Sequence, residues 1–148
     1  MMVGIPGSGK STAAARLARG ESVVLIATYK MRAELTGSEA DRSLDRLVFP
    51  RVQAAIARAL AEGRNVVYDA TNLTRRERKK ILRILPPGTH KVCCFLDAAL
   101  EGALRRNAAR ARVVPPPVIA KMRAKLEVPA TDEGWDEIRI IAPEQCEG

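Results

Sequence analysis

The residues of this chain whose types and spacing could do chemistry begin close to the N-terminus. Gly4-Ile5-Pro6-Gly7-Ser8-Gly9-Lys10-Ser11 satisfies the pattern G-x-x-x-x-G-K-[ST] in full, after an apolar start and before a helix-forming run. Glycines let successive backbone N–H groups converge on phosphate oxygens, and a helix N-terminus adds partial positive charge. In this pattern the lysine neutralises the β- and γ-phosphates and the serine hydroxyl coordinates Mg²⁺. The stretch therefore predicts a site for ATP or GTP with Mg²⁺, bound by Gly7, Ser8, Gly9, Lys10, Ser11 and Thr12.

A second candidate is Asp69, which closes the apolar run "NVVYD". Ligands of open α/β sheets bind at the carboxyl ends of the strands, so a carboxylate there suits a Mg²⁺ ion, one of its waters or an incoming hydroxyl. The alternative is an N-cap for the following turn. With the glycine loop in the same chain, we interpret Asp69 as a metal-binding and catalytic residue.

The elements that must position these groups alternate between short apolar runs and helical spacing, which predicts an α/β fold with a parallel sheet of about five strands flanked by helices. The strands are expected at 1–3, which is unusually short, and at 22–27, 65–70, 91–96 and 137–142. The helices are expected at 50–63, with Pro50 in the first turn, at 75–85 after Thr74 as N-cap, at 99–112 and at 118–127.

Length and composition predict one intracellular domain. The chain has 148 residues, which is one domain by size, and no apolar run long enough for a membrane helix. Cys93 and Cys94 should point to opposite faces of a strand, and Cys146 is alone, so a reducing cytoplasm is expected. The net charge of +8 indicates either a polyanionic partner or an arginine-rich proteome.

Three stretches together make the chain resemble the small P-loop kinases of the polynucleotide 5′-kinase and zeta-toxin type, an AAA-type ATP-binding family. They are the glycine loop, the turn "DATN" at 69–72, and "RRNAARARVVPPP" at 105–117 with "EGW" after it. The resemblance covers nearly the whole chain. It implies a single P-loop NTPase-type domain over 1–148 with a helical arginine lid at about 105–126, and transfer of the ATP γ-phosphoryl to a hydroxyl. In the polynucleotide kinases that hydroxyl is an RNA or DNA 5′ end.

The resemblance also implies roles for single residues. Arg110 matches the lid arginine that reaches the transferring phosphoryl, with Arg106 and Arg112 as neighbours able to share that work, and Asn72 would brace the acceptor loop. Positive charge on the equatorial oxygens independently favours such an arginine. The run "RRERKK" at 75–80 is either a solvated helix face or a guide for a phosphodiester backbone, in which case Arg75 binds the acceptor.

One position departs from the family pattern. After the second strand the family has an S-S-D-x-x-R-type stretch, whose aspartate accepts the proton of the attacking hydroxyl and whose arginine holds the acceptor. Here the chain reads "ATYKMR", so Arg32 matches the arginine but Tyr29 replaces the aspartate. A neutral phenol is no ready base. Either Asp69 takes over as base, or the protein binds nucleotide without transfer, or Tyr29 stacks on a different acceptor.

Three functions follow from these observations. The first is a kinase for a nucleic acid 5′-OH end, the second a small-molecule kinase for an antibiotic or a nucleotide sugar, and the third a nucleotide-binding module without catalysis. His90 is expected in a turn, and Trp135 in core packing rather than a nucleobase wall. The sequence leaves the oligomeric state open.

Overall fold

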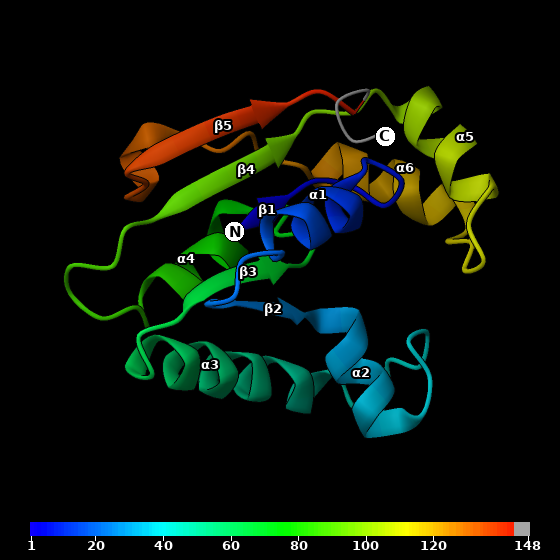
Figure 1. The fold of residues 1–148 in the computed structure, drawn as a ribbon. Helices are drawn as coiled ribbons and strands as arrows, with labels where there is room; N and C mark the ends of the chain where they lie inside the picture. The colour runs from blue at the N-terminus through cyan, green and yellow to red at the C-terminus, as the bar shows by residue number, and fades with distance from the viewer. Residues whose placement is uncertain (144–148) are drawn as a thin grey trace.

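The computed structural model describes residues 1–143, which form a parallel α/β fold with five strands and six α-helices (Figure 1). The strands are β1 (Met2–Val3), β2 (Val23–Ala27), β3 (Asn65–Asp69), β4 (Val92–Leu96) and β5 (Glu137–Ile141). The helices are α1 (Lys10–Leu17), α2 (Thr28–Thr36), α3 (Asp45–Ala61), α4 (Arg75–Leu82), α5 (Leu100–Ala108) and α6 (Pro116–Lys125), with a 3₁₀ turn, η1, at Thr131–Glu133. The predicted fold class and all five strand positions are confirmed.

The sheet consists of two hydrogen-bonded sections, β2-β3 and β1-β4-β5. The short β1 lies beside β3, and the two sections are joined where the strands end (Figure 1). There the Gly4 N–H donates to the Thr71 carbonyl at 3.0 Å, and Asn72 Nδ2 donates to the Met2 carbonyl at 2.7 Å. The glycine loop and the "DATN" turn are therefore held side by side by the junction itself.

Helices cover both faces of the sheet. On one face α1 packs Ala13 and Ala14 against β1, β3 and β4, and on the other α3 packs Val52 and Ile56 against β2 and β3. Cys94 belongs to the first cluster, whereas Cys93 packs with Val3 and Phe95 on the opposite face, as period-two alternation requires. Cys146 lies outside the described residues. Among residues 1–143 no helix is long and apolar enough to cross a membrane.

Several helix boundaries differ from the sequence-based expectation. Helix α3 begins at Asp45, so the placement of Pro50 in its first turn was wrong. The upstream residues are helical because Val48 is buried in the core and Asp45 is held by Arg32 from α2, a helix that the sequence analysis did not identify. The stabilisation from these contacts is greater than the cost of the helix hydrogen bond that Pro50 cannot donate.

The predicted lid, 105–126, contains the last turn of α5, a loop and α6. Helix α5 ends at Ala108, four residues earlier than expected, because Asn107 turns the chain. Its amide donates to the Val114 carbonyl at 2.8 Å and accepts from the Val114 N–H at 3.0 Å. Pro116 and Pro117 then occupy the first turn of α6, where proline is well tolerated.

Candidate nucleotide and acceptor site

The glycine loop needs its glycines for two local reasons. Gly7 and Gly9 have φ values of 79° and 92°, in the left-handed region that favours glycine. A Cβ on Gly7 would also collide with the backbone carbonyl of Ala103 in α5. The loop is thereby packed directly against the helix that begins the arginine-rich segment.

Lys10 is buried at the start of α1, and its Nζ donates to the Ile5 carbonyl at 3.0 Å. Burial lowers the pKa of Lys10 to about 8, Asp69 opposes this shift, and Arg110 adds to it. The ammonium is thus poorly solvated and short of negative partners. Phosphate oxygens over the loop would supply them.

A small cavity of about 230 Å³ lies over the loop. Its lining residues are Gly7, Gly9, Lys10, Ser11, Thr12, Arg106 and Arg110. Arg106 crosses to the loop, where its Nε donates to the Gly7 carbonyl at 2.7 Å. Ser8 is fully buried behind this lining, and Arg112 lines a second, larger cavity instead. The cavity combines backbone amides with three cationic side chains, which suits a polyphosphate.

Asp69 ends β3 at the mouth of the larger cavity, opposite Ala27 at the end of β2. Its side chain is buried, and its Oδ2 has no hydrogen-bond partner. A buried carboxylate oxygen without a partner indicates a missing ligand or water. The Ser11 hydroxyl lines the same cavity, and hard oxygen donors of this kind, completed by substrate phosphates and waters, fit Mg²⁺. The described residues contain no cluster of three His, Cys, Asp or Glu side chains that could hold a metal alone.

The larger cavity, of about 540 Å³, continues from Lys10, Ser11 and Arg110 toward α2, α3 and α6. We call it the acceptor cavity. Tyr29, in the first turn of α2, forms part of its wall near Ser11. Burial, followed by the negative charge of Asp69, raises the pKa of Tyr29, so the phenol is neutral at physiological pH.

Two other predicted acceptor residues also line this cavity. Arg32 is buried, donating from Nε to Asp45 Oδ1 at 2.7 Å and from Nη1 to the Glu39 carbonyl at 3.2 Å. Asn72 has a φ of 48°, which asparagine tolerates better than most residues, and its amide reaches back to Met2. Both side chains are therefore fixed by the protein before any ligand enters.

The basic run at 75–80 is divided between three roles. Arg75 does not line the acceptor cavity but forms a two-bond ion pair with Asp132, at 2.9 and 2.6 Å. Arg78 is fully buried and paired with Glu133. It therefore belongs neither to a solvated helix face nor to a surface that guides a phosphodiester backbone. Lys80 does line the cavity, over the Phe49 ring at 5.5 Å from its centroid.

The cavity residues to which the sequence analysis gave no role of their own include Arg42, Phe49 and Lys80, of which Lys80 belongs to the run 75–80 weighed there as a whole. Phe49 and Arg42 follow α2 at positions where the sequence carries no motif, and only the packing of α3 against α2 brings them to the site. Lys80 lies on the helix that follows the "DATN" turn, one turn beyond Glu77, which lines the same cavity. Residues at this spacing share one face of a helix.

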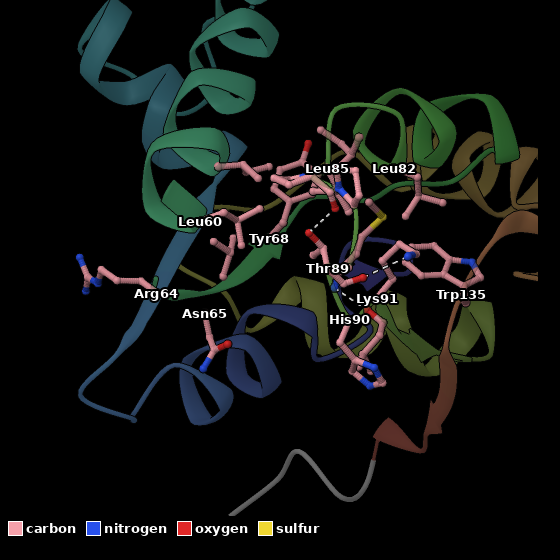
Figure 2. Close-up of a pocket in the computed structure, with 18 of the residues that line it drawn as sticks. Leu60, Arg64, Asn65, Tyr68, Leu82, Leu85, Thr89, His90, Lys91 and Trp135 are labelled. Carbon is pink, nitrogen blue, oxygen red and sulfur yellow. Dashed lines mark hydrogen bonds between the residues drawn. The ribbon is translucent and has the colours of Figure 1, made fainter. Parts of the chain in front are cut away.

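Another cavity, of about 560 Å³, lies where β3 and β4 begin (Figure 2). Leu60, Tyr68 and Leu85 form its apolar wall, and His90 and Lys91 lie at its rim (Figure 2). None of the predicted site residues lines it. His90 is exposed, as expected of a turn residue, and Trp135 packs against the core cluster of Val3, Cys93 and Phe95.

Comparison with known proteins gives matches over most of the chain. A family model described as an AAA domain matches residues 1–129. An L-seryl-tRNA(Sec) kinase from Methanococcus maripaludis is 33% identical over 82 residues, which is 55% of this chain and 32% of that protein. The match thus spans about a third of the length of this curated relative.

Solved structures share the fold. A chain of the Pnkp1/Rnl/Hen1 RNA repair complex matches with a TM-score of 0.76 and 23% identity, over 84% of this chain and 42% of its own. A gluconokinase from Sinorhizobium meliloti matches with a TM-score of 0.63 and 22% identity, over 97% of this chain and 81% of its own. A deoxyadenosine kinase from M. mycoides with bound dATP matches with a TM-score of 0.51 and 14% identity, over 97% of this chain and 90% of its own. The predicted resemblance to small P-loop kinases is confirmed by these matches.

Proposed function

The chain belongs to the AAA domain family, and we propose from this premise that it is an ATP-dependent kinase whose acceptor is a nucleic acid 5′-hydroxyl end. The observation that carries the proposal is the acceptor cavity, which opens from the phosphate-binding cavity and has a basic wall. Its cationic side chains beyond Lys10 are Arg32, Arg42, Lys80, Arg110 and Arg112. Tyr29 and Phe49 add aromatic surface on which a terminal base could stack.

On this proposal the donor phosphates occupy the 230 Å³ cavity over the glycine loop. Lys10 neutralises the β- and γ-phosphates there, and Arg110, which lines both cavities, holds the transferring group between donor and acceptor. Ser11 would hold Mg²⁺ and Asp69 one of its waters, and the ion would supply further positive charge against the phosphates. Positioning and charge neutralisation account for most of the acceleration in such a transfer.

The acceptor hydroxyl loses its proton to Asp69 Oδ2 in our proposal. This oxygen is buried and has no partner in the described structure, and Asp69 lines the cavity that the acceptor enters. Tyr29 cannot take the role because its pKa is raised, first by burial. A general base contributes roughly 10²–10⁴-fold to the rate. On this proposal Asp69 makes that contribution in place of the family's aspartate, whose position Tyr29 occupies.

A small-molecule kinase is the second candidate, and the charge balance of the cavity favours it in part. Arg32 and Arg42 are both ion-paired with Asp45, and Arg112 with Glu39, so much of the basic wall is already neutralised. Val114, Val118 and Met122 make the opposite wall apolar. A neutral alcohol would fit such a wall better than a long polyanion.

Labelled phosphate transfer from MgATP to 5′-OH oligonucleotides and to small alcohols tests the proposal. Arg110→Ala should reduce transfer by ~10³-fold, as expected for an arginine on the transferring phosphoryl. The matched control is Arg105→Ala, because Arg105 belongs to the same lid but is exposed and paired with Glu101, outside both cavities. Its rate should change by less than about threefold.

Salt dependence separates the two kinase readings. Oligonucleotide binding should weaken steeply with salt, with a log–log slope of several units, because phosphate contacts release counterions. Transfer to a small alcohol with no measurable oligonucleotide binding at low salt would replace the first candidate with the second. ATP binding without transfer to any acceptor would leave only the nucleotide-binding module.

A further inference from the structure

A hydroxyl of the protein itself, that of Tyr29, already lies in the wall of the acceptor cavity. Tyr29 is two residues beyond Ala27, whose register partner across the β2-β3 pair is Asp69. The side chain lines the acceptor cavity from the first turn of α2, and it lies near Ser11. Ser11 is the residue that follows the phosphate-binding lysine.

The groups needed for phosphoryl transfer surround this phenol. Lys10, Asp69 and Arg110 line the same cavity as Tyr29, and Lys10 and Arg110 also line the phosphate cavity. The free Oδ2 of Asp69 is buried at the end of the neighbouring strand. Tyr29 is only half-buried, so its hydroxyl is not sealed away from a bound nucleotide.

We propose that Tyr29 is a self-phosphorylation site, receiving the γ-phosphoryl of a nucleoside triphosphate bound in the same molecule. The inference rests on the proposed kinase function. The bond between Pγ and the β–γ bridging oxygen breaks, a bond between Pγ and Tyr29 Oη forms, and the phenolic proton passes to solvent. The nucleoside diphosphate leaves, so atoms and charge balance without another reactant.

The product would close the acceptor cavity. A phosphotyrosine carries close to two negative charges and three acceptor oxygens. Arg110 and Arg112 line the same cavity and can pair with it, while its bulk takes the space that an incoming hydroxyl needs. Self-phosphorylation therefore switches the site off toward external acceptors and leaves the nucleotide-binding loop in place.

The test is to incubate the protein with γ-labelled MgATP and no added acceptor, and to map the label by peptide mass spectrometry. The chain has two tyrosines, which provides a matched control. Tyr68 also lines the acceptor cavity, but it is buried in the core with Val52 and Ile56, and phenylalanine keeps its ring, so Tyr68→Phe should keep the protein-bound label. Tyr29→Phe should lose more than about nine-tenths of it and still bind ATP. The wild type should reach up to one phosphate per chain, and the fraction of chains labelled per unit time should be independent of protein concentration.

Three outcomes would overturn the inference. One is a wild type that phosphorylates an external acceptor but carries no label on Tyr29, which would leave the proposed function standing. Another is equal labelling of the wild type and Tyr29→Phe. The third is a labelled fraction per unit time that rises in proportion to protein concentration, which would show transfer between molecules. Failure to bind ATP would instead remove both the inference and the proposed function.

Discussion

The buried ion pair between Arg78 and Glu133 offers the sharpest test of how the fold supports the site. Both side chains have 0% exposure, and they are joined by hydrogen bonds of 2.7 and 2.6 Å. Arg78 Nη1 also donates to the Asn72 and Leu73 carbonyls, at 3.0 and 3.1 Å. One guanidinium therefore ties α4, the "DATN" turn and the segment before β5 together.

Arg78→Met removes all four hydrogen bonds, replaces the guanidinium with a shorter apolar side chain and leaves a buried carboxylate. Breaking a buried pair by removing one partner costs about 3–5 kcal/mol. For a domain of this size that corresponds to a fall in Tm of about 6–20 °C, at about 2–4 °C per kcal/mol. Urea unfolding followed by circular dichroism measures the free energy directly.

Two comparisons make the result specific. Arg76→Met changes an exposed arginine of the same helix and should stay within about 0.5 kcal/mol. The double variant Arg78→Met with Glu133→Leu should lose clearly less than the sum of the two single variants, since no unpaired charge remains. A loss below about 1 kcal/mol for Arg78→Met, or strict additivity, would refute our reasoning about this pair.

Three further predictions concern the loop and the two titrating groups. Gly7→Ala should lower ATP affinity at least tenfold, measured by calorimetry, because its φ of 79° and the Ala103 carbonyl leave no room for a Cβ; near-normal affinity would contradict the packing. The pKa of Lys10 is about 8 in the free protein, and bound phosphates raise it, so ATP affinity should be constant well below pH 8 and fall by up to tenfold per pH unit above it. Calorimetry in two buffers should show proton uptake on binding near pH 8, and its absence would count against a buried Lys10. Burial alone would raise the pKa of Glu133, but hydrogen bonds, chiefly from Arg78, hold it below its ordinary 4.5. Its contribution to stability should be complete above pH 4.5 and lost as the pH falls through the lowered pKa, and Glu133→Gln should flatten this dependence in urea titrations.

The parts of the site that depend on local sequence could be predicted. The glycine loop is contiguous, so its residue types already specify its conformation, and Asp69 follows from the rule that ligands meet the ends of parallel strands. The N-cap of α4 was equally local, since Thr74 and Glu77 form a capping box three residues apart.

What could not be predicted depends on partners distant in the sequence. Arg78 and Glu133 are 55 residues apart, and the sequence "RRERKK" cannot show that one of its cations is buried while the others are not. Arg75 was expected at the acceptor for the same reason, although its carboxylate partner is Asp132. The start of α3 was misplaced because local proline propensity gave way to tertiary contacts of Asp45 and Val48.

Because the sheet has two sections, nucleotide binding between them should change the stability of both. The glycine loop extends from the β1-β4-β5 section, whereas Asp69 and Tyr29 extend from the β2-β3 section. A ligand bound between them contacts both sections, so its binding free energy stabilises the two sections together rather than one local contact. Amide hydrogen exchange should therefore slow on ATP binding in β2 and β3 as far as Asn65, at the end of the sheet remote from the phosphates.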